Sequence, residues 1–416
     1  GTTGPAGNCL DVIVNVKNYG LNTQTTFPVT YVVNPGGLTG TTTYNGTLTP
    51  GATAQVTIPC FVVPNGPYSI CAYTGLPGDG NNLNDTVCSS SLGIPVLTLT
   101  SCDDFESGNI GFQDSTTNAA AAQWQLGTPG FGVTTGAHSG VNAWDINLNT
   151  GYGTGAYASL NTAIYDLNGT TNAYLSFWRN QRTASNDGLR VMYNVNGSGV
   201  WQVLGSVNDP DALNWYNNNA LNFGNAGWDG SSNGWQESRY YLQNIITATG
   251  ATFIQFRFEF VSGFNGTPND GVSIDDLCVK QPGPNDVGVV AIQEPTPNGP
   301  AGGTSNVSVI IRNFGTATQT SIPVEYTVNG TVTGNATYLG SLAPNATALF
   351  SMPTFTVPSG QYSFSAYTQL AGDSDNSNDT STVNRVGVPV IPLSYTSPYF
   401  DNFDGVNVGW SANVLG

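Results

Sequence analysis

The 416-residue chain is predicted to be all-β and to consist of several antiparallel sandwich domains. Short alternating runs such as "DVIVNVKN" and "YSICAYT" recur between Gly, Pro and Asn residues, which is typical of half-buried strands. Charged residues make up only 8% of the chain, whereas 18 Phe, 19 Tyr and 8 Trp provide material for apolar cores. This balance argues against disorder. An internal duplication then divides the chain into modules.

The duplication relates the beginning of the chain to its last third. "VKNYGLNTQTTFPVTYVV" at 16–33 matches "IRNFGTATQTSIPVEYTV" at 311–328, and later segments match in the same order. The acidic stretch "SCDDFESGNIGFQ" at 101–113 returns as "DNFDGVNVGW" at 401–410. Such a register is the signature of tandem modules. Two module types therefore alternate, and we expect the chain to be a segment of a longer array.

The first module type resembles the bacterial cell-adhesion-related Ig-like (CARDB) domains. The resemblance rests on an Asn-aromatic-Gly turn, a strand with Pro-Val and a final "NDT", and it covers 1 to about 97 and 286 to about 393. It implies small β-sandwiches that serve as spacers or adhesive units in secreted or surface proteins. The predicted domains are an Ig-like domain at 1–97, truncated at its N-terminus, a central module at 98–281, an Ig-like domain at 282–393 and the start of another central module at 394–416.

Four of the six cysteines lie in the first Ig-like module. Cys9 and Cys60 are placed on strands expected to be antiparallel neighbours, and Cys71 and Cys88 flank one turn at nearly equal distances. The second copy has Thr or Ser at all four places, as expected if they form the pairs Cys9–Cys60 and Cys71–Cys88; free buried thiols are the alternative. Disulfides place a protein outside the cytoplasm.

The central module resembles the MAM domains, which are jelly-roll sandwiches of secreted and cell-surface proteins. The resemblance rests on "CDDFESGNIGFQ", "YLSFWRN", "DGLRVMYNVNGSGVWQVLG" and "NDGVSIDDLCV". The insert "NDPDALNWYNNNALNFGNAGWDGSSNGW" and the lack of interior cysteines depart from the family. Because the first and last strands of such a jelly roll are neighbours, the resemblance implies a disulfide between Cys102 and Cys278.

The same adjacency brings two acidic stretches together. The chain has only two Lys, so pairing with Lys can neutralise few of these acids, and carboxylates without His suit Ca²⁺. We expect a structural calcium there; solvated acids and a catalytic carboxylate pair are the alternatives. Phe105 is expected to be buried while its neighbours point outward. The candidate ligands are Asp104, Glu106, Asp275 and Asp276, with Asp145 as a further one.

The aromatic insert is the candidate for recognition of surface glycans, because aromatic rings beside amides commonly stack on and hydrogen-bond to sugars. The alternative is that these rings pack over a sheet. The candidate residues are Trp215, Tyr216, Trp228 and Trp235.

No catalytic constellation is recognisable, and we predict that the chain is not an enzyme. His138, the only histidine, has no nucleophile motif around it. With nine basic against 26 acidic residues and a net charge of −17, nucleic acid is a poor partner. No apolar run approaches the ~20 residues of a membrane-spanning helix, so no membrane insertion is expected in this segment.

These observations predict an extracellular, non-catalytic segment of a repetitive fibre, stalk or adhesin on the cell surface. Its composition and its arrangement of modules resemble those of the large secreted adhesins of Bacteroidota. Neighbouring repeats are the expected partners, with assembly into a filament, because sandwich modules must protect or use their edge strands. The alternative function is a glycan-binding accessory region of a secreted hydrolase.

Overall fold

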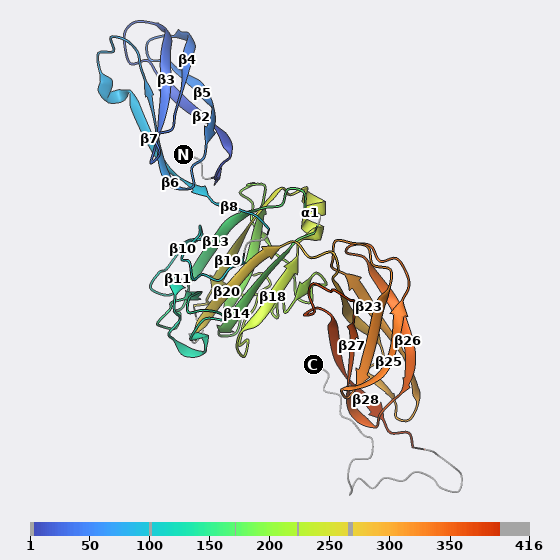
Figure 1. The fold of residues 1–416 in the computed structure, drawn as a ribbon. Helices are drawn as coiled ribbons and strands as arrows, with labels where there is room; N and C mark the ends of the chain where they lie inside the picture. Colours follow the sequence, from blue (N-terminus) through green and yellow to red (C-terminus); the bar gives the residue numbers. More distant parts are fainter. Residues whose placement is uncertain (1–3, 100–101, 171, 223, 265–268, 392–416) are drawn as a thin grey trace, which may run out of the picture. The chain divides into compact units, whose positions relative to one another are not determined.

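The structure, a computed structural model, describes residues 4–99, 102–170, 172–222, 224–264 and 269–391. These residues form β-sandwiches, which confirms the all-β prediction (Figure 1). The chain separates into two compact units: the first holds an Ig-like domain and the central sandwich, and the second holds the other Ig-like domain. The predicted start of another central module, 394–416, lies outside the described residues.

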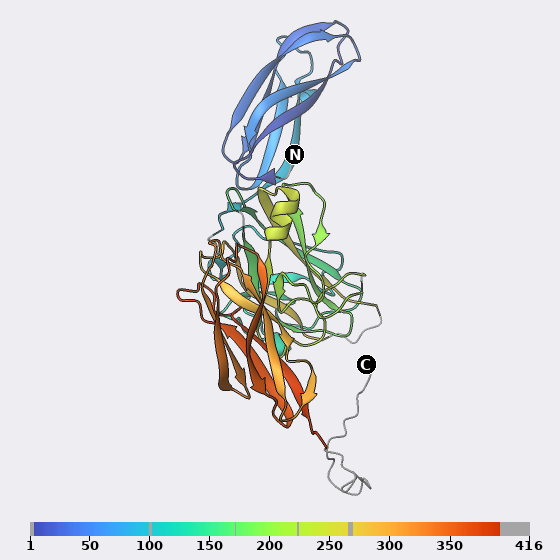
Figure 2. The same ribbon diagram turned by 90° about the vertical axis from the view of Figure 1, so that its right-hand side faces the viewer.

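The first Ig-like domain is a sandwich of a five-stranded sheet, in the order β1-β7-β6-β3-β4, and a two-stranded sheet, β2-β5. Its strands run along the length of the domain in Figure 1 and Figure 2. The core is built by alternate residues of these strands, such as Val29, Tyr31 and Val33 of β3. The elements are β1 (Gly4–Pro5), β2 (Cys9–Lys17), β3 (Gln24–Asn34), β4 (Thr39–Leu48), β5 (Thr53–Val62), β6 (Gly66–Thr74), η1 (Asn82–Asn84) and β7 (Thr86–Ile94).

The Asn-aromatic-Gly motif of the repeat is a turn held by an asparagine side chain. Asn18 Nδ2 donates to the carbonyl oxygens of Asn22 and Leu48, and its Oδ1 accepts the Gly20 amide at 2.9 Å. Asn313 makes the corresponding bonds in the second copy. The motif repeats because one side chain satisfies three backbone groups at the end of a strand.

The central domain is a sandwich of two mainly antiparallel sheets, with the short strand β8 added in parallel to β13. The β13 sheet has the order β10-β13-β19-β15-β16 and the β20 sheet the order β11-β12-β20-β14-β18-β17, with β9 paired to β20. Phe177 of β14 and Phe258 of β19 are fully buried and meet edge to face at 4.9 Å between ring centroids, which joins the sheets. The elements are β8 (Val96–Leu97), β9 (Cys102–Asp103), β10 (Gln113–Thr116), β11 (Trp124–Gly127), η2 (Gly132–Thr134), β12 (Ala143–Ile146), β13 (Tyr157–Asp166), β14 (Tyr174–Arg182), β15 (Gly188–Val195), β16 (Gln202–Val203), β17 (Ala212–Leu213), β18 (Gln236–Tyr241), α1 (Gln243–Thr249), β19 (Phe253–Val261) and β20 (Gly271–Lys280).

The second Ig-like domain has the same plan with a larger second sheet. Its sheets are β22-β28-β27-β24-β25 and the three-stranded β21-β23-β26. Ser365 and Thr382 occupy the places of Cys71 and Cys88, and their hydroxyl oxygens are 2.8 Å apart. A hydrogen bond thus replaces the disulfide. The elements are β21 (Val287–Glu294), β22 (Asn298–Pro300), β23 (Thr304–Asn313), β24 (Ile322–Val328), β25 (Thr331–Tyr338), β26 (Thr347–Thr356), β27 (Gly360–Thr368) and β28 (Thr380–Val388).

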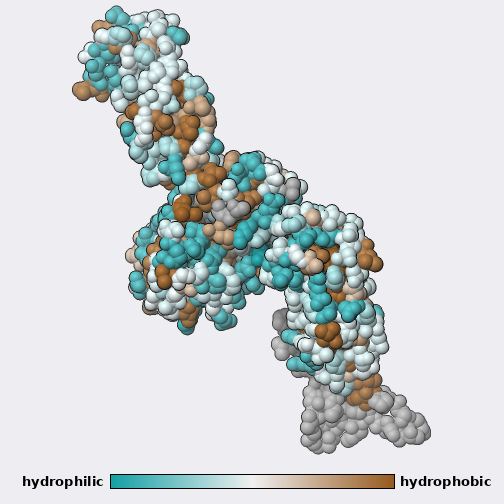
Figure 3. Space-filling model, in the orientation of Figure 1, coloured by the Kyte–Doolittle hydropathy of each residue, from teal (hydrophilic) through white to brown (hydrophobic). Residues whose placement is uncertain are grey.

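All six cysteines are paired as the sequence predicts, in Cys9–Cys60, Cys71–Cys88 and Cys102–Cys278. Three disulfides are typical of proteins outside the cytoplasm. On the face shown in Figure 3, the coloured surface is largely hydrophilic or neutral, with apolar residues in scattered patches. Among the described residues, no helix combines the length and the apolar character needed to cross a lipid bilayer.

Candidate functional site

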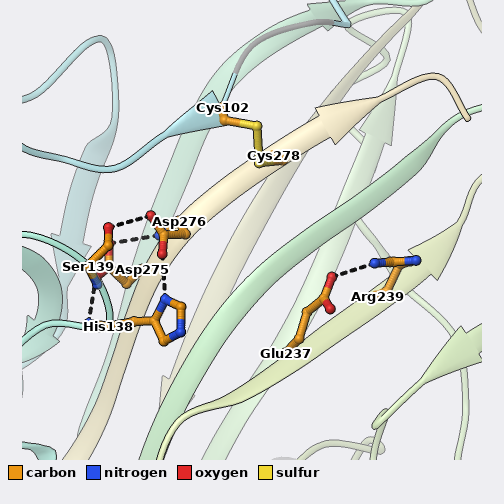
Figure 4. Close-up of a disulfide and its surroundings, with 8 residues drawn as sticks. All are labelled: Cys102, His138, Ser139, Glu237, Arg239, Asp275, Asp276 and Cys278. Carbon is orange, nitrogen blue, oxygen red and sulfur yellow. Dashed lines mark hydrogen bonds and ion pairs between the residues drawn. A yellow bond between two sulfur atoms is a disulfide. The ribbon is translucent and has the colours of Figure 1, made fainter. Parts of the chain in front are cut away.

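The first and last strands of the central sandwich lie side by side. Cys102 of β9 is opposite Cys278 of β20 in an antiparallel pair, and the disulfide joins them (Figure 4). Their Cα atoms are 4.1 Å apart, although 176 residues separate them in the sequence. The chain therefore enters and leaves this sandwich at nearly the same point.

The acidic stretch after Cys102 forms a turn around a buried ring. Asp103 Oδ1 accepts the Phe105 amide at 2.9 Å. Phe105 has a φ of 59°, which is uncommon outside glycine, and its ring is fully buried 5.4 Å from that of Phe112. The expected burial of Phe105 is confirmed. Burial raises the pKa of Asp103, whereas Asp104 is exposed and accepts an amide within its own turn.

Three of the predicted acids bind one loop, residues 138–142, and we call Glu106, Asp275 and Asp276 the acid clamp. Glu106 Oε1 accepts the amides of Val141 and Asn142 at 2.8 and 2.7 Å. Asp275 Oδ2 accepts the amides of residues 138 and 139 at 2.8 and 3.1 Å. Asp275 is fully buried, and burial raises its pKa to about 6. The clamp thus joins a loop to the strands that the disulfide links.

Asp276 completes the clamp through side chains. Its Oδ2 lies 2.5 Å from His138 Nδ1, and its Oδ1 accepts the Ser139 hydroxyl at 2.7 Å (Figure 4). The imidazole of His138 stacks on Trp178 at 3.7 Å and meets Trp235 edge-on at 5.9 Å. Ser139 donates to the carboxylate and not to the imidazole, so this is not the Ser-His-Asp relay of a hydrolase.

His138, Ser139 and Trp178 were not identified from the sequence as parts of a site. The hydrogen bonds from His138 and Ser139 to Asp276 span 138 and 137 residues. No local sequence motif predicts a contact between residues so far apart in the sequence. The one signal in the sequence was that His138 is the only histidine of the chain.

Asp145 lies apart from the acid clamp. Its Oδ1 accepts the Ser273 hydroxyl at 2.6 Å, and its buried Oδ2 has no hydrogen-bond partner. Burial is the main cause that raises the pKa of Asp145 to about 7. Among the described residues, no three His, Cys, Asp or Glu side chains are grouped so that they could hold a metal ion. Calcium therefore stays a prediction, and the geometry of Asp104 and the acid clamp does not support it.

We expect Asp145 to make folding less favourable as the pH rises. Its pKa is raised in the folded state, so its favourable contribution is complete below about pH 4 and is lost as the pH rises through about 7. Asp145→Asn removes the ionisation. Between pH 5 and pH 8 the free energy of unfolding of the variant should rise by roughly 2–3 kcal/mol relative to the unsubstituted protein. Urea unfolding at both pH values measures this difference.

The control is Ser273→Ala, which removes the hydroxyl that donates to Asp145 but keeps the carboxyl group, and should show no such gain. An equal gain in both variants would contradict the role given to Asp145. The same measurement with Ca²⁺ and with EDTA tests the calcium prediction: stabilisation by Ca²⁺ that Asp145→Asn abolishes would support a cation at this carboxylate.

The predicted glycan platform is wrong for three of its four residues. Trp215, Tyr216 and Trp228 are 8%, 3% and 1% exposed, and the two tryptophans donate their indole N–H groups to the Leu204 and Asn214 carbonyl oxygens. They pack inside the sandwich because the insert covers the edge of β15, where Leu189 and Trp228 form a bridge. Only Trp235 of the four is partly exposed.

The fold defines an all-β, disulfide-linked protein in which one Ig-like domain precedes a central sandwich in the sequence and another follows it. Residues 285–384, the second Ig-like domain, match the CARDB family model. This match confirms the adhesion-type Ig-like resemblance for that domain. No curated protein matches the chain.

Solved structures match parts of the chain. A CARDB domain from Pyrococcus furiosus, solved in complex with di-metal ions, is 22% identical over 25% of this chain and 89% of that one, with a TM-score of 0.22. An Endo-D glycoside hydrolase domain from Streptococcus pneumoniae R6 is 9% identical over 66% and 37%, with a TM-score of 0.25. A putative β-galactosidase from Bacteroides fragilis is 13% identical over 67% and 41%, with a TM-score of 0.28. At these scores the hydrolases carry no argument about function.

Proposed function

We propose that the chain is a non-catalytic, tension-bearing segment of an extracellular adhesive protein whose repeats assemble into a fibre or stalk. The observation that carries this proposal is the disulfide between Cys102 and Cys278, which joins adjacent strands at the two ends of the central sandwich. A pulling force applied to the flanking domains passes through this covalent link. The strands between the two cysteines are thereby spared from the load.

Two further features support the proposal. The acid clamp ties loop 138–142 to β20 beside the disulfide, so the point at which force is applied is also braced by hydrogen bonds. The match of residues 285–384 to CARDB supports an adhesion-type module. Disulfides favour a location outside the cytoplasm.

Immunogold electron microscopy of cells that make the native protein tests this proposal. An antibody against the folded chain should label filaments or the outer surface of intact cells. Label confined to the cytoplasm would contradict an extracellular role.

The alternative function is a glycan-binding accessory region. Three of the four aromatic residues predicted to bind glycans, Trp215, Tyr216 and Trp228, are buried in the core. A glycan array probed with the whole chain discriminates the two functions. We expect no signal that depends on Trp235, because its neighbour Trp178 is already covered by His138. Binding to defined glycans that Trp235→Ala abolishes, with the fold intact, would favour the accessory function.

A further inference from the structure

The five-stranded sheet of the first Ig-like domain ends in an open strand. β4 is last in the order β1-β7-β6-β3-β4, and its hydrogen-bonded neighbour among the described strands is β3 alone. The two strands pair without interruption from Thr39 to Asn45 of β4, so the other side of β4 presents a regular row of backbone groups. The second Ig-like domain, which includes β21, is open at the equivalent strand, β25. The open edge is therefore common to both copies of the domain.

Several other strands that end a sheet carry a feature that discourages pairing with another chain. β16 and β17 have two residues each, and β5 and β26 contain Pro59 and Pro353. β25 has a register shift between Tyr326 and Thr327 of its neighbour β24. Short strands, prolines and bulges are the devices that natural proteins use to protect sheet edges. β4 has ten residues, none of them charged or proline, and between Thr39 and Asn45 it lacks all of these devices.

The whole sheet to which β4 belongs is uncharged. Its five described strands, β1, β3, β4, β6 and β7, contain no Asp, Glu, Lys or Arg, although the chain has a net charge of −17. The equivalent sheet of the second domain carries Glu325 and Arg385. Because net charge of one sign makes copies of a protein repel one another, this sheet is a surface on which two acidic chains can meet without local repulsion.

Packing holds β4 in its extended conformation. Tyr44 stacks on Phe27 with 4.9 Å between the ring centroids. Gly40 lies close against the ring of Tyr31, where a Cβ atom would be 2.5 Å from Cε1. A strand that is already ordered loses little conformational freedom when it pairs, so the edge is preorganised for a partner.

We propose that β4 pairs antiparallel with β4 of a second copy of the chain, which joins two five-stranded sheets into one continuous sheet. An antiparallel pair of identical strands is related by a two-fold axis, so each edge supplies the donors and acceptors that the other needs. Thr39, Thr41 and Thr43 are exposed, and threonine hydroxyls of facing strands can hydrogen-bond, as those of Thr30 and Thr41 do within the domain at 2.9 Å. The pairing rests on the proposed function, the assembly of repeats, and joins neighbouring copies side by side.

Sedimentation velocity of the complete chain, from micromolar to near-millimolar concentration, measures the association. The chain should form a dimer as its concentration rises. Thr43→Lys should raise the dissociation constant of the dimer at least about tenfold, because it places two ammonium groups at the paired edge. The control is Thr57→Lys, which adds the same charge at an exposed position of β5 in the other sheet and should change the constant by less than about twofold.

Hydrogen exchange of the backbone amides at low and high concentration locates the pair. Residues 39–48 should become protected as the dimer forms, whereas residues 331–338 of the bulged β25 should not. A dimer that protects a different segment would overturn the proposal, as would equal weakening by the two Lys substitutions. Protection of residues 39–48 that does not vary with concentration would place a segment of the same chain on this edge, and would overturn the assignment to a second copy.

Failure of the β4 pairing can be told apart from failure of the proposed function. A chain that stays monomeric over the whole concentration range would overturn the pairing. Immunogold label on filaments or on the outer surface of cells does not depend on β4, so it would still support the proposed function in that case. Label confined to the cytoplasm would contradict the proposed function whether or not the purified chain forms a dimer.

Discussion

Pulled from its two ends under oxidising conditions, the chain is expected to release almost none of the length between Cys102 and Cys278. The chain between them, which has a sequence separation of 176, would extend to roughly 60 nm if unfolded. Because the disulfide joins the strands at which force enters and leaves, this length stays hidden until the bond is reduced. Single-molecule force spectroscopy, without and with a thiol reductant, measures the release directly.

The double variant Cys102→Ser and Cys278→Ser should release the full length without reductant, at forces set by the strands alone. The matched control is Cys71→Ser with Cys88→Ser, which opens a loop of 17 residues and should add only roughly 6 nm. A release near 60 nm from the oxidised, unsubstituted chain would refute the tension-bearing role of the central domain.

Trp228→Ala is expected to destabilise the central domain by about 3–5 kcal/mol, as large-to-small substitutions of buried aromatics do. The ring is 1% exposed and contacts those of Trp215 and Tyr216 at centroid distances of 4.8 and 4.6 Å. The buried guanidinium of Arg179 lies 4.8 Å from the same ring, and burial lowers its pKa to about 9. The substitution therefore removes packing and the cation–π contact of a desolvated cation, which keeps its hydrogen bonds to Ser238 and Gln236.

Urea unfolding followed by tryptophan fluorescence measures this loss, because seven of the eight Trp lie between residues 102 and 280 and report on the central domain. Trp235→Ala is the control: its ring is partly exposed, so the loss of stability should be clearly smaller. Equal losses in the two variants would mean that the insert does not contribute to the core through Trp228.

The fold class followed from the sequence because strand patterns are local. Period-two alternation in "FIQFRFEF" places Phe256, Phe258 and Phe260 on one face, and all three are fully buried in β19. The pairing of the four cysteines in the first Ig-like domain also followed, since the second copy has lost all four together. The resemblance to MAM domains stays a prediction, because the matching family model covers residues 285–384 and not the central module.

The aromatic insert shows where sequence reasoning failed. Trp215 and Trp228 stand among Asn and Gly, a composition that indicates an exposed loop. The structure buries them because β16 pairs with β15 only at Met192 and Tyr193, and the insert covers the edge of β15 near Leu189. A strand edge with apolar neighbours favours a segment that can cover it. Nothing local to residues 214–235 reveals that edge.

The sequence by itself determined the all-β class, the modular repeat and the two disulfides of the first Ig-like domain, because alternation, repeat register and the joint loss of four cysteines can be read along the chain. The Cys102–Cys278 pair was implied only by the resemblance to MAM domains. Only the tertiary structure decided what the acids and aromatics do. The acid clamp joins Glu106, Asp275 and Asp276 to loop 138–142 across up to 138 residues, and such contacts depend on how strands are ordered in space. Burial also depends on residues that are distant in the sequence and close in the fold. Such burial places the aromatic insert in the core and raises the pKa of Asp145.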